Sequence, residues 1–337
     1  MPRSASLNEF FGVSDNVGTV KQEGARLILD TLQQIKPDAA DIAVVNSLWG
    51  SLSSVRDFAR LVEQQRLIGT PGQTTVWAGA FGSFTDVSMQ HGFTANSGGY
   101  AVGVQHAFSE KLRGGVSLGQ STGTVESKGA ERLKNDQRGM MAAALLQYEQ
   151  LRPGKNSFLF NGYAAVGNVE NDTKGAVNAS WDDMVVCIGG RASYGIACGQ
   201  SSWVVPFAGL EWSSAQQGDI TRADGASYTD GELNLLTLPV GVSMRSDFTL
   251  SNGAVLAPEV TLAYEANLVK DCPQNTIRKG KKSCTAEGYD SGDQSFMLNA
   301  SLNVLFNEHW SAGASYTIRT AEHSVNQSVN ASVRYMF

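Results

Sequence analysis

The sequence has few charges for its length and no long apolar run. Of its 337 residues, 17% are charged, against roughly 25% in an ordinary soluble domain. No apolar window reaches the length of about 18 residues that a membrane-spanning helix needs, so such a helix is excluded. The net charge of -6 leaves no basic footprint for nucleic acid. The first residues hold no apolar core of signal-peptide length, which leaves a cytoplasmic protein or a chain whose export signal has been removed.

Cysteine and histidine are scarce, with four of each. Neither type shows metal-ligand spacing, so we expect no metal site and no cofactor. Cys272 and Cys284 bound a short polar loop, CPQNTIRKGKKSC, and are candidates for a disulfide, with free thiols as the alternative. Such a bond would indicate an oxidising compartment or the cell exterior. Cys187 falls in an expected strand and Cys198 in a turn, and the chain between them spans ~36 Å, beyond disulfide reach.

One amphipathic helix stands near the start of the chain. Its apolar residues recur at helical spacing, and charged residues stand between them. These apolar residues are Leu48, Leu52, Val55, Ala59 and Val62. Pro37 precedes the pattern, and Gly69, Pro71 and Gly72 follow it, as expected at helix boundaries. The expected organisation is a partly helical linker over 1–37, a helix over 38–70, and strands over 71–337.

After Pro71 the period changes from 3.6 to 2. The last three segments alternate most cleanly and begin near Phe296, Trp310 and Ser328. Each predicts a strand of about ten residues with one apolar and one small or polar face. Nine further segments begin near Thr74, Gly98, Leu112, Gln137, Asn156, Trp181, Trp203, Leu233 and Ala254. The total is about twelve strands.

The connections between these strands alternate in length. Short ones follow Phe108, Tyr148, Ala197, Met244 and Phe306, and longer polar ones intervene. This puts the long loops at one end of the sheet, as in an outer-membrane up-and-down barrel with short periplasmic turns. A β-sandwich has no reason to separate its loops by length. We therefore predict an all-β membrane fold, a twelve-stranded antiparallel transmembrane barrel.

The size of this barrel leaves room for the helix. Twelve strands spaced about 4.8 Å and tilted about 40° enclose a lumen on the order of 10–14 Å wide, and a helix with its side chains is about 10–12 Å across. We expect the helix to pass down the lumen from the outside, with the N-terminus and the long loops at the cell surface.

Polar residues on the inward parity offer partners for that helix. The expected lumen wall includes Arg191, Glu211, Glu259 and Glu265. Buried charges are tolerable only when they are paired or wet. We therefore expect Arg56 and Arg60 to face lumen acids such as Glu259 or Glu265, with lumen water as the alternative.

At this point the sequence resembles the translocator domain of autotransporters, the type V secretion system of Gram-negative bacteria. The resemblance rests on NSLWGSLSSVRDF, which includes Asn46 and Trp49, on WAGAFGSF, on VPFAGLEW and on the terminal VRYMF. It implies an outer-membrane translocator that anchors and helps to export an N-terminal passenger, of which 1–37 would be at most a stump. It also implies a monomer embedded in outer-membrane lipid.

The resemblance assigns further roles to particular residues. The β-barrel assembly machinery would recognise the C-terminal strand, whose apolar face ends in Val333, Tyr335 and Phe337. Some relatives cut themselves at a paired Asn-Asn in the lumen helix. Here Ser47 follows Asn46, which puts such cleavage in doubt.

Two other functions stay open as alternatives. One is a surface anchor or porin-like barrel whose loops bind a surface. The other is a barrel hydrolase, since Gly115, Ser117 and Gly119 fit the G-x-S-x-G pattern. That chemistry needs a strand–elbow–helix context, and a polar loop follows here instead, so we expect no enzyme.

Overall fold

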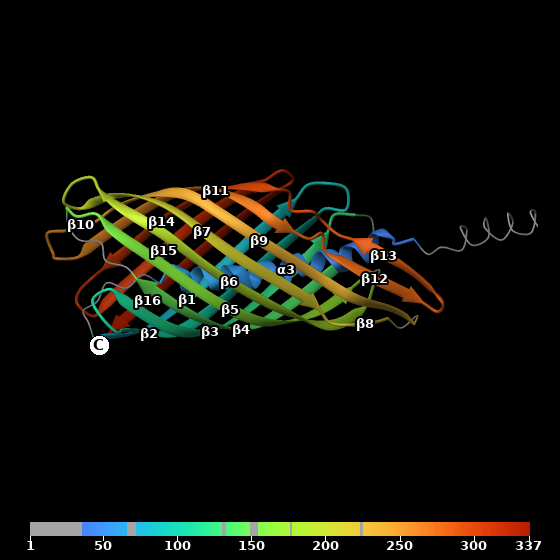
Figure 1. Ribbon diagram of the computed structural model, residues 1–337. Coiled ribbons are helices and arrows are strands. Elements are labelled where there is room, and N and C mark those ends of the chain that lie inside the picture. Colours follow the sequence, from blue (N-terminus) through green and yellow to red (C-terminus); the bar gives the residue numbers. More distant parts are fainter. Residues whose placement is uncertain (1–35, 66–71, 130–132, 149–153, 176, 223–224) are drawn as a thin grey trace, which may run out of the picture.

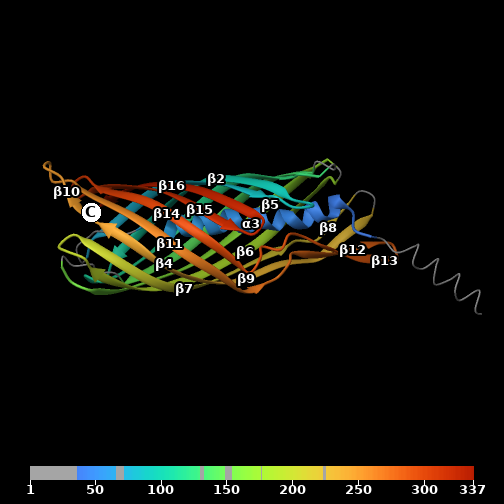
Figure 2. The ribbon, with the colours of Figure 1, turned by 90° about the horizontal axis from the view of Figure 1, so that it is seen from above.

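The protein is a closed antiparallel barrel with a helix along its axis (Figures 1 and 2). The computed structural model describes residues 36–65, 72–129, 133–148, 154–175, 177–222 and 225–337. Twelve long strands form the wall: β1 (Thr74–Val87), β2 (Phe93–Ala107), β3 (Leu112–Ser127), β4 (Lys134–Tyr148), β5 (Ser157–Lys174), β6 (Ala179–Ala197), β7 (Ser202–Gln217), β9 (Ala226–Ser246), β11 (Val255–Lys270), β14 (Gln294–Leu305), β15 (Trp310–Ala321) and β16 (Ser324–Met336). The predicted barrel and its strand count are confirmed.

Four short strands extend this wall: β8 (Ile220–Thr221), β10 (Phe248–Thr249), β12 (Gln274–Lys279) and β13 (Lys282–Glu287). The β12–β13 hairpin projects from one end of the barrel, which we call the hairpin end (Figure 1). The opposite end, with the short connections, is the turn end. The barrel closes at β1 and β16, which pair from Thr75 opposite Met336 to Val87 opposite Ser324.

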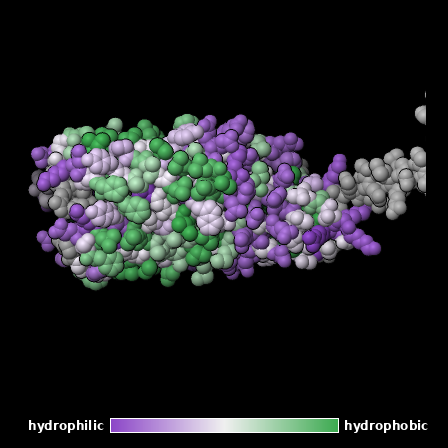
Figure 3. Space-filling view, viewed as in Figure 1, coloured by the Kyte–Doolittle hydropathy of each residue, from purple (hydrophilic) through white to green (hydrophobic). Residues whose placement is uncertain are grey.

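The faces of the strands are reversed relative to a soluble protein. On β16 the outward Val325, Val329 and Val333 are exposed, whereas the inward Asn330 and Arg334 are buried. Exposed apolar side chains occur on every long strand and so form a belt around the barrel. On the face that Figure 3 shows, the surface turns hydrophilic toward the hairpin end. This is the pattern of a sheet with lipid outside and a polar lumen.

The strands are longer than the expected ten residues. β5, β6 and β9 contain 18, 19 and 21 residues, and most of the polar segments expected to be loops are strand instead. At about 3.3 Å per residue and a tilt of about 40°, an 18-residue strand rises about 45 Å, well beyond an apolar band of about 25 Å. Beyond the lipid the outward face meets water, and inward residues such as Asn171 and Thr173 are polar although buried. The apolar alternation therefore stops while the main-chain pairing continues.

The helix α3 spans Ala39–Glu63 and lies inside the barrel (Figure 2). It begins where the sequence predicted but ends at Glu63, with its C-cap at Gln64, so the predicted helix is too long over 64–65. Residues 66–70 of the prediction lie outside the described residues, as does most of 1–37. Leu48, Leu52 and Val55 are buried against the wall. In the part of the chain that the structure describes, no helix is long and apolar enough to cross a membrane.

The expected disulfide is wrong, because all four cysteines are free thiols. Cys284 lies opposite Ile277 in the β12–β13 hairpin. Cys272 is five positions before Ile277, which is about 16 Å along an extended chain. Cys272 and Cys284 therefore lie on the two sides of this hairpin but not opposite each other, and the distance along the strands keeps them from bonding. Cys187 is buried in β6 and Cys198 is exposed in the turn after it, as the sequence predicted.

Candidate functional site: the lumen helix and its polar contacts

The first turn of α3 is fixed to the wall at the hairpin end. Asp38 and Asp41 form a capping box, in which each carboxylate accepts the main-chain N–H of the other residue at 2.9 Å. The Tyr228 hydroxyl of β9 donates to Asp41 Oδ1 at 2.7 Å. The same carboxylate thus caps the helix and attaches it to the barrel.

A second attachment, which we call the clasp, joins α3 to the loops at the hairpin end. Asn46 Oδ1 accepts the N–H of Tyr289 at 2.7 Å, and Asn46 Nδ2 donates to the carbonyl of His91 at 3.2 Å. Trp49 Nε1 donates to the carbonyl of Tyr289 at 3.0 Å. The Tyr289 ring contacts those of Trp49 and Phe93, and burial raises the pKa of its hydroxyl. The clasp occupies both polar ends of the Asn46 side chain.

The middle of the helix contacts a buried hydrogen-bond network around Asp183 of β6. Ser51 Oγ donates to Asp183 Oδ2 at 2.6 Å, Asn171 Nδ2 donates to the same oxygen at 2.9 Å, and Trp181 Nε1 donates to Oδ1 at 2.8 Å. Gln137 Nε2 donates to Ser51 Oγ at 3.0 Å. Ser51 is the donor from α3, so the helix is joined to β6 through Asp183 and to β4 through Gln137, while Asn171 and Trp181 hold the carboxylate in place.

Sequence reasoning missed this network. Asp183 belongs to an acid pair, Asp182-Asp183, and such pairs are typical of polar loops. Strand parity could have indicated it. Asp183 and the inward Cys187 are an even number of residues apart on one strand, so both side chains point into the barrel.

Next to this network, toward the turn end, lies a layer of charged residues, which we call the charge layer: Arg56, Glu211, Glu265 and Arg319. Arg56 Nε donates to Glu211 Oε1 of β7 at 2.7 Å, and the Tyr163 hydroxyl donates to the other carboxylate oxygen. Arg319 Nη2 donates to Glu265 Oε1 at 2.8 Å across β14. The charges are therefore paired, as burial requires.

The partners of the two helix arginines differ from the sequence prediction. Arg56 pairs with Glu211 and not with Glu259 or Glu265. Arg60 lies 3.4 Å from Asp57 of its own helix, one turn earlier. Glu265 is paired by Arg319, while Glu259 accepts a hydrogen bond from Thr261 of its own strand. The reason is rotational: α3 packs mainly against β1 to β7, so Arg56 points to β7 and away from β11.

The last turn of α3 is held at the turn end. Arg191 of β6 lies 3.3 Å from the Glu63 carboxylate and over the Phe207 ring. Gln64 accepts from Ser315, and Gln65 accepts from Arg334 Nε at 2.9 Å. The helix is thus attached along its whole length, from its N-cap to the residues after its C-terminus.

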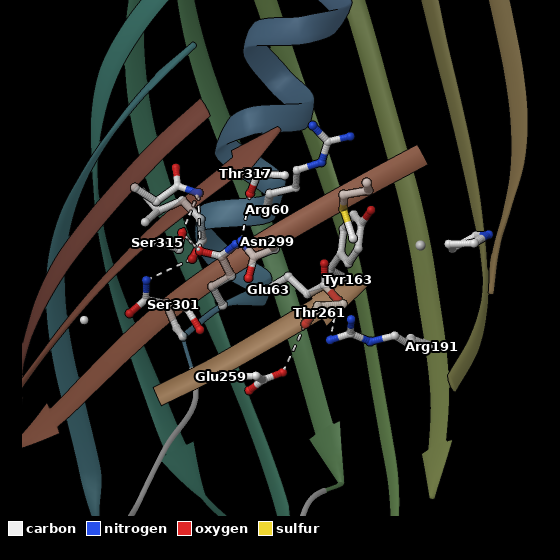
Figure 4. A pocket seen from close by; sticks show the side chains of 18 of the residues that line it. Arg60, Glu63, Tyr163, Arg191, Glu259, Thr261, Asn299, Ser301, Ser315 and Thr317 are labelled. Carbon is white, nitrogen blue, oxygen red and sulfur yellow. Dashed lines mark hydrogen bonds and ion pairs between the residues drawn. The ribbon is translucent and has the colours of Figure 1, made fainter. Parts of the chain in front are cut away.

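Two small cavities remain beside the helix. One of about 140 Å³ opens below Arg60 (Figure 4) and is walled by Glu259, Thr261 and Ser315. The other, of about 120 Å³, lies closer to the hairpin end, next to Trp49. Arg60, Glu265 and Arg319 line both. Each has room for only a few water molecules, and the charge layer separates them.

The G-x-S-x-G segment has a structural explanation. It lies inside β3, which continues to Ser127, and Ser117 Oγ is buried 3.5 Å from the carbonyl of Ala143. A Cβ on Gly119 would stand 2.7 Å from the Phe58 ring of α3. Glycine is therefore needed there for the close approach of helix and wall. Within the described residues no group of three His, Cys, Asp or Glu side chains could hold a metal ion.

The last strand places its expected signal residues on the lipid side at the turn end. Val333, Tyr335 and Phe337 are exposed, and Tyr335 contacts the rings of Trp310 and Phe337. The N–H and carbonyl of Phe337 pair with those of Thr74 at 2.9 and 3.0 Å. The chain's last residue therefore completes the barrel seam.

Comparisons with known proteins agree with this architecture. The family described as "Autotransporter beta-domain" matches residues 76–317. The chain is 22% identical over 340 residues to "Probable outer membrane protein pmp7" of Chlamydia pneumoniae, and 21% identical over 350 residues to pmp1 of the same organism. These matches cover 89% and 90% of this chain, but the chain spans only 36% of either relative.

Two solved structures of similar fold are a translocator domain and a transport unit of autotransporters. The translocator domain of NalP from Neisseria meningitidis superposes with a TM-score of 0.65 at 14% identity, covering 89% of this chain and 99% of that one. The transport unit of AIDA-I from Escherichia coli gives 0.63 at 12% identity, covering 86% and 99%. At such identities the likeness concerns the fold.

Proposed function

The chain belongs to the autotransporter β-domain family, as an outer-membrane translocator barrel, and on that premise we propose how it anchors and exports a passenger. One observation carries the proposal: α3 fills the lumen with its N-terminus at the hairpin end, while β1 begins at the turn end. A segment that precedes α3 must therefore leave at the hairpin end. The role of this family is transport and not catalysis.

We propose that the hairpin end faces the cell surface and the turn end the periplasm. The support is the position of the apolar belt, because on the face shown in Figure 3 the hydrophilic surface is more extensive toward the hairpin end than toward the turn end. Short connections at the opposite end are typical of the periplasmic side of such barrels.

A natural thiol tests this orientation. Cys198 is exposed in the turn between β6 and β7 at the turn end. With the other three cysteines changed to serine, a membrane-impermeant maleimide should leave Cys198 unlabelled on whole cells and label it after the outer membrane is permeabilised. Labelling on intact cells would reverse the assignment.

The plug itself is tested by conductance. Wild-type protein in planar bilayers should conduct poorly, because α3 and the charge layer fill the lumen beside cavities of about 140 and 120 Å³. Deletion of 39–63 should raise the single-channel conductance several-fold, since it empties a lumen on the order of 10–14 Å wide. Equal conductance of the two proteins would show that α3 does not close the pore.

We propose that the exposed face of Val333, Tyr335 and Phe337 is the signal read by the β-barrel assembly machinery, and that the assembled barrel is a monomer. The closed β1–β16 seam supports a self-contained barrel. Phe337→Ala should lower the amount of folded protein in the outer membrane. Phe306→Ala is the matched control, because Phe306 is a comparably exposed aromatic residue at the same end (54% against 62%). Equal loss in both variants would contradict a specific signal.

A further inference from the structure

The tip of the β12–β13 hairpin carries a cluster of exposed cations. Arg278, Lys281 and Lys282 are all exposed, and within the described residues no acidic side chain pairs with any of them. We call these three residues the cationic tip. Lys279, directly opposite Lys282, adds a fourth cation. This density of positive charge contrasts with the chain's net charge of -6.

Three other exposed lysines near this end behave differently. Lys128 lies 2.7 Å from Asp86, Lys174 lies 3.4 Å from Asp136, and Lys134 lies 3.6 Å from the same carboxylate. These lysines are already neutralised by the barrel. The cationic tip therefore has charge available for an outside partner.

The hairpin holds the cationic tip rigidly. Ile277 and Ala286 are buried against the first turns of α3, next to Ala40 and Val44. β12 also pairs with β9, with Lys279 opposite Ala226, so the hairpin continues the barrel wall. Gly280 closes the turn with a φ of 64°, which a glycine adopts without strain. A fixed scaffold lowers the entropy cost of binding.

The cationic tip stands well above the membrane. Leu236 is the last outward apolar residue of β9 before the hairpin end, and ten residues separate it from Ala226. Ten residues rise about 25 Å at a tilt of about 40°, whereas one headgroup layer is about 5–8 Å thick. The anionic groups of the surrounding lipid are therefore too low to reach.

The side chains at the tip favour a polysaccharide over a nucleic acid. No aromatic residue occurs between Gln274 and Glu287, whereas single-stranded nucleic acid is bound largely by stacking of its bases on aromatic rings. Lysines act as point charges for tetrahedral anions, and a sulfated chain presents such anions without bases. We propose that the cationic tip binds a sulfated polysaccharide outside the bacterium. The outward direction of the hairpin rests on the proposed function.

Binding can be tested on the purified full-length barrel in zwitterionic detergent, with heparin as the probe. Wild-type protein should bind immobilised heparin at physiological salt. The R278Q/K281Q/K282Q variant should bind about tenfold or more weakly, since each exposed ionic contact contributes a few-fold. In a plot of log affinity against log salt concentration, the slope for this variant should also be smaller in magnitude than that of the wild type by about two to three.

The matched control removes the same number of charges elsewhere. K128Q/K134Q/K174Q should bind heparin as the wild type does, because those lysines are paired. Heat-modified gel mobility verifies that each variant is folded. Absence of wild-type binding, or equal loss in both variants, would overturn the proposal. Stronger binding to single-stranded DNA, to unsulfated hyaluronan or to lipopolysaccharide vesicles would assign the tip to another partner and overturn it as well. The assay needs no export, so the translocator function stands or falls separately.

Discussion

Replacing Glu211 by glutamine should loosen the lumen helix measurably. The substitution keeps the shape of the side chain and an acceptor for Tyr163, but it leaves Arg56 without its counter-charge. Removal of one partner of a buried pair costs about 3–5 kcal/mol. Both side chains keep 16% exposure, and water can solvate part of the charge, so we expect about 2 kcal/mol, or about a 30-fold larger fraction of displaced helix.

Cys187 supplies the assay. It is fully buried beneath α3, and on β6 it lies two residues from Gly189, which is opposite Glu211. In a variant with the other three cysteines replaced by serine, a small maleimide reaches Cys187 only when the helix moves away. If helix motion is fast relative to the reaction, the labelling rate is proportional to the open fraction.

Two controls make the result specific to the ion pair. Glu259→Gln removes a lumen acid of β11, which is not the acid that pairs with Arg56, and it should change the labelling rate by less than about threefold. Arg56→Met combined with Glu211→Gln removes both charges, so its rate should lie well below the product of the two single effects. A wild-type rate for Glu211→Gln, or strictly multiplicative single effects, would refute the role of this pair in holding the helix.

Two further outcomes follow from the described contacts. Gly119→Leu should lower the free energy of unfolding by about 1–3 kcal/mol, because its side chain would enter the space of the Phe58 ring. Heat-modified gel mobility measures this loss. Gly98→Leu is the control and should have little effect, because a Cβ at Gly98 meets nothing closer than 3.7 Å. Cys272 and Cys284 should both react with a thiol reagent in the unfolded, unreduced protein, and a thiol count that is two short would contradict the free state.

The sequence alone determined the class of fold and the place of the helix. The alternation in β14, β15 and β16 is a local property, because the side-chain period of a strand depends only on its backbone. The strand count then fixed the lumen diameter, and the diameter admitted one helix. Parity also assigned Glu211 and Cys187 to the inner face before any contact was known.

The tertiary structure decided which groups meet inside that lumen. Whether Arg56 faces Glu211 or Glu265 depends on the rotation and height of α3, and these are set by several distant contacts together, from Asp183 and Tyr289 to Gln65. No local sequence pattern encodes the combined effect of these distant contacts. The strand extensions beyond the lipid were likewise invisible in the sequence, because their outer face meets water and their buried inner face includes polar residues such as Asn171 and Thr173. Such a strand shows no hydrophobic period, and only the pairing of neighbouring strands reveals it.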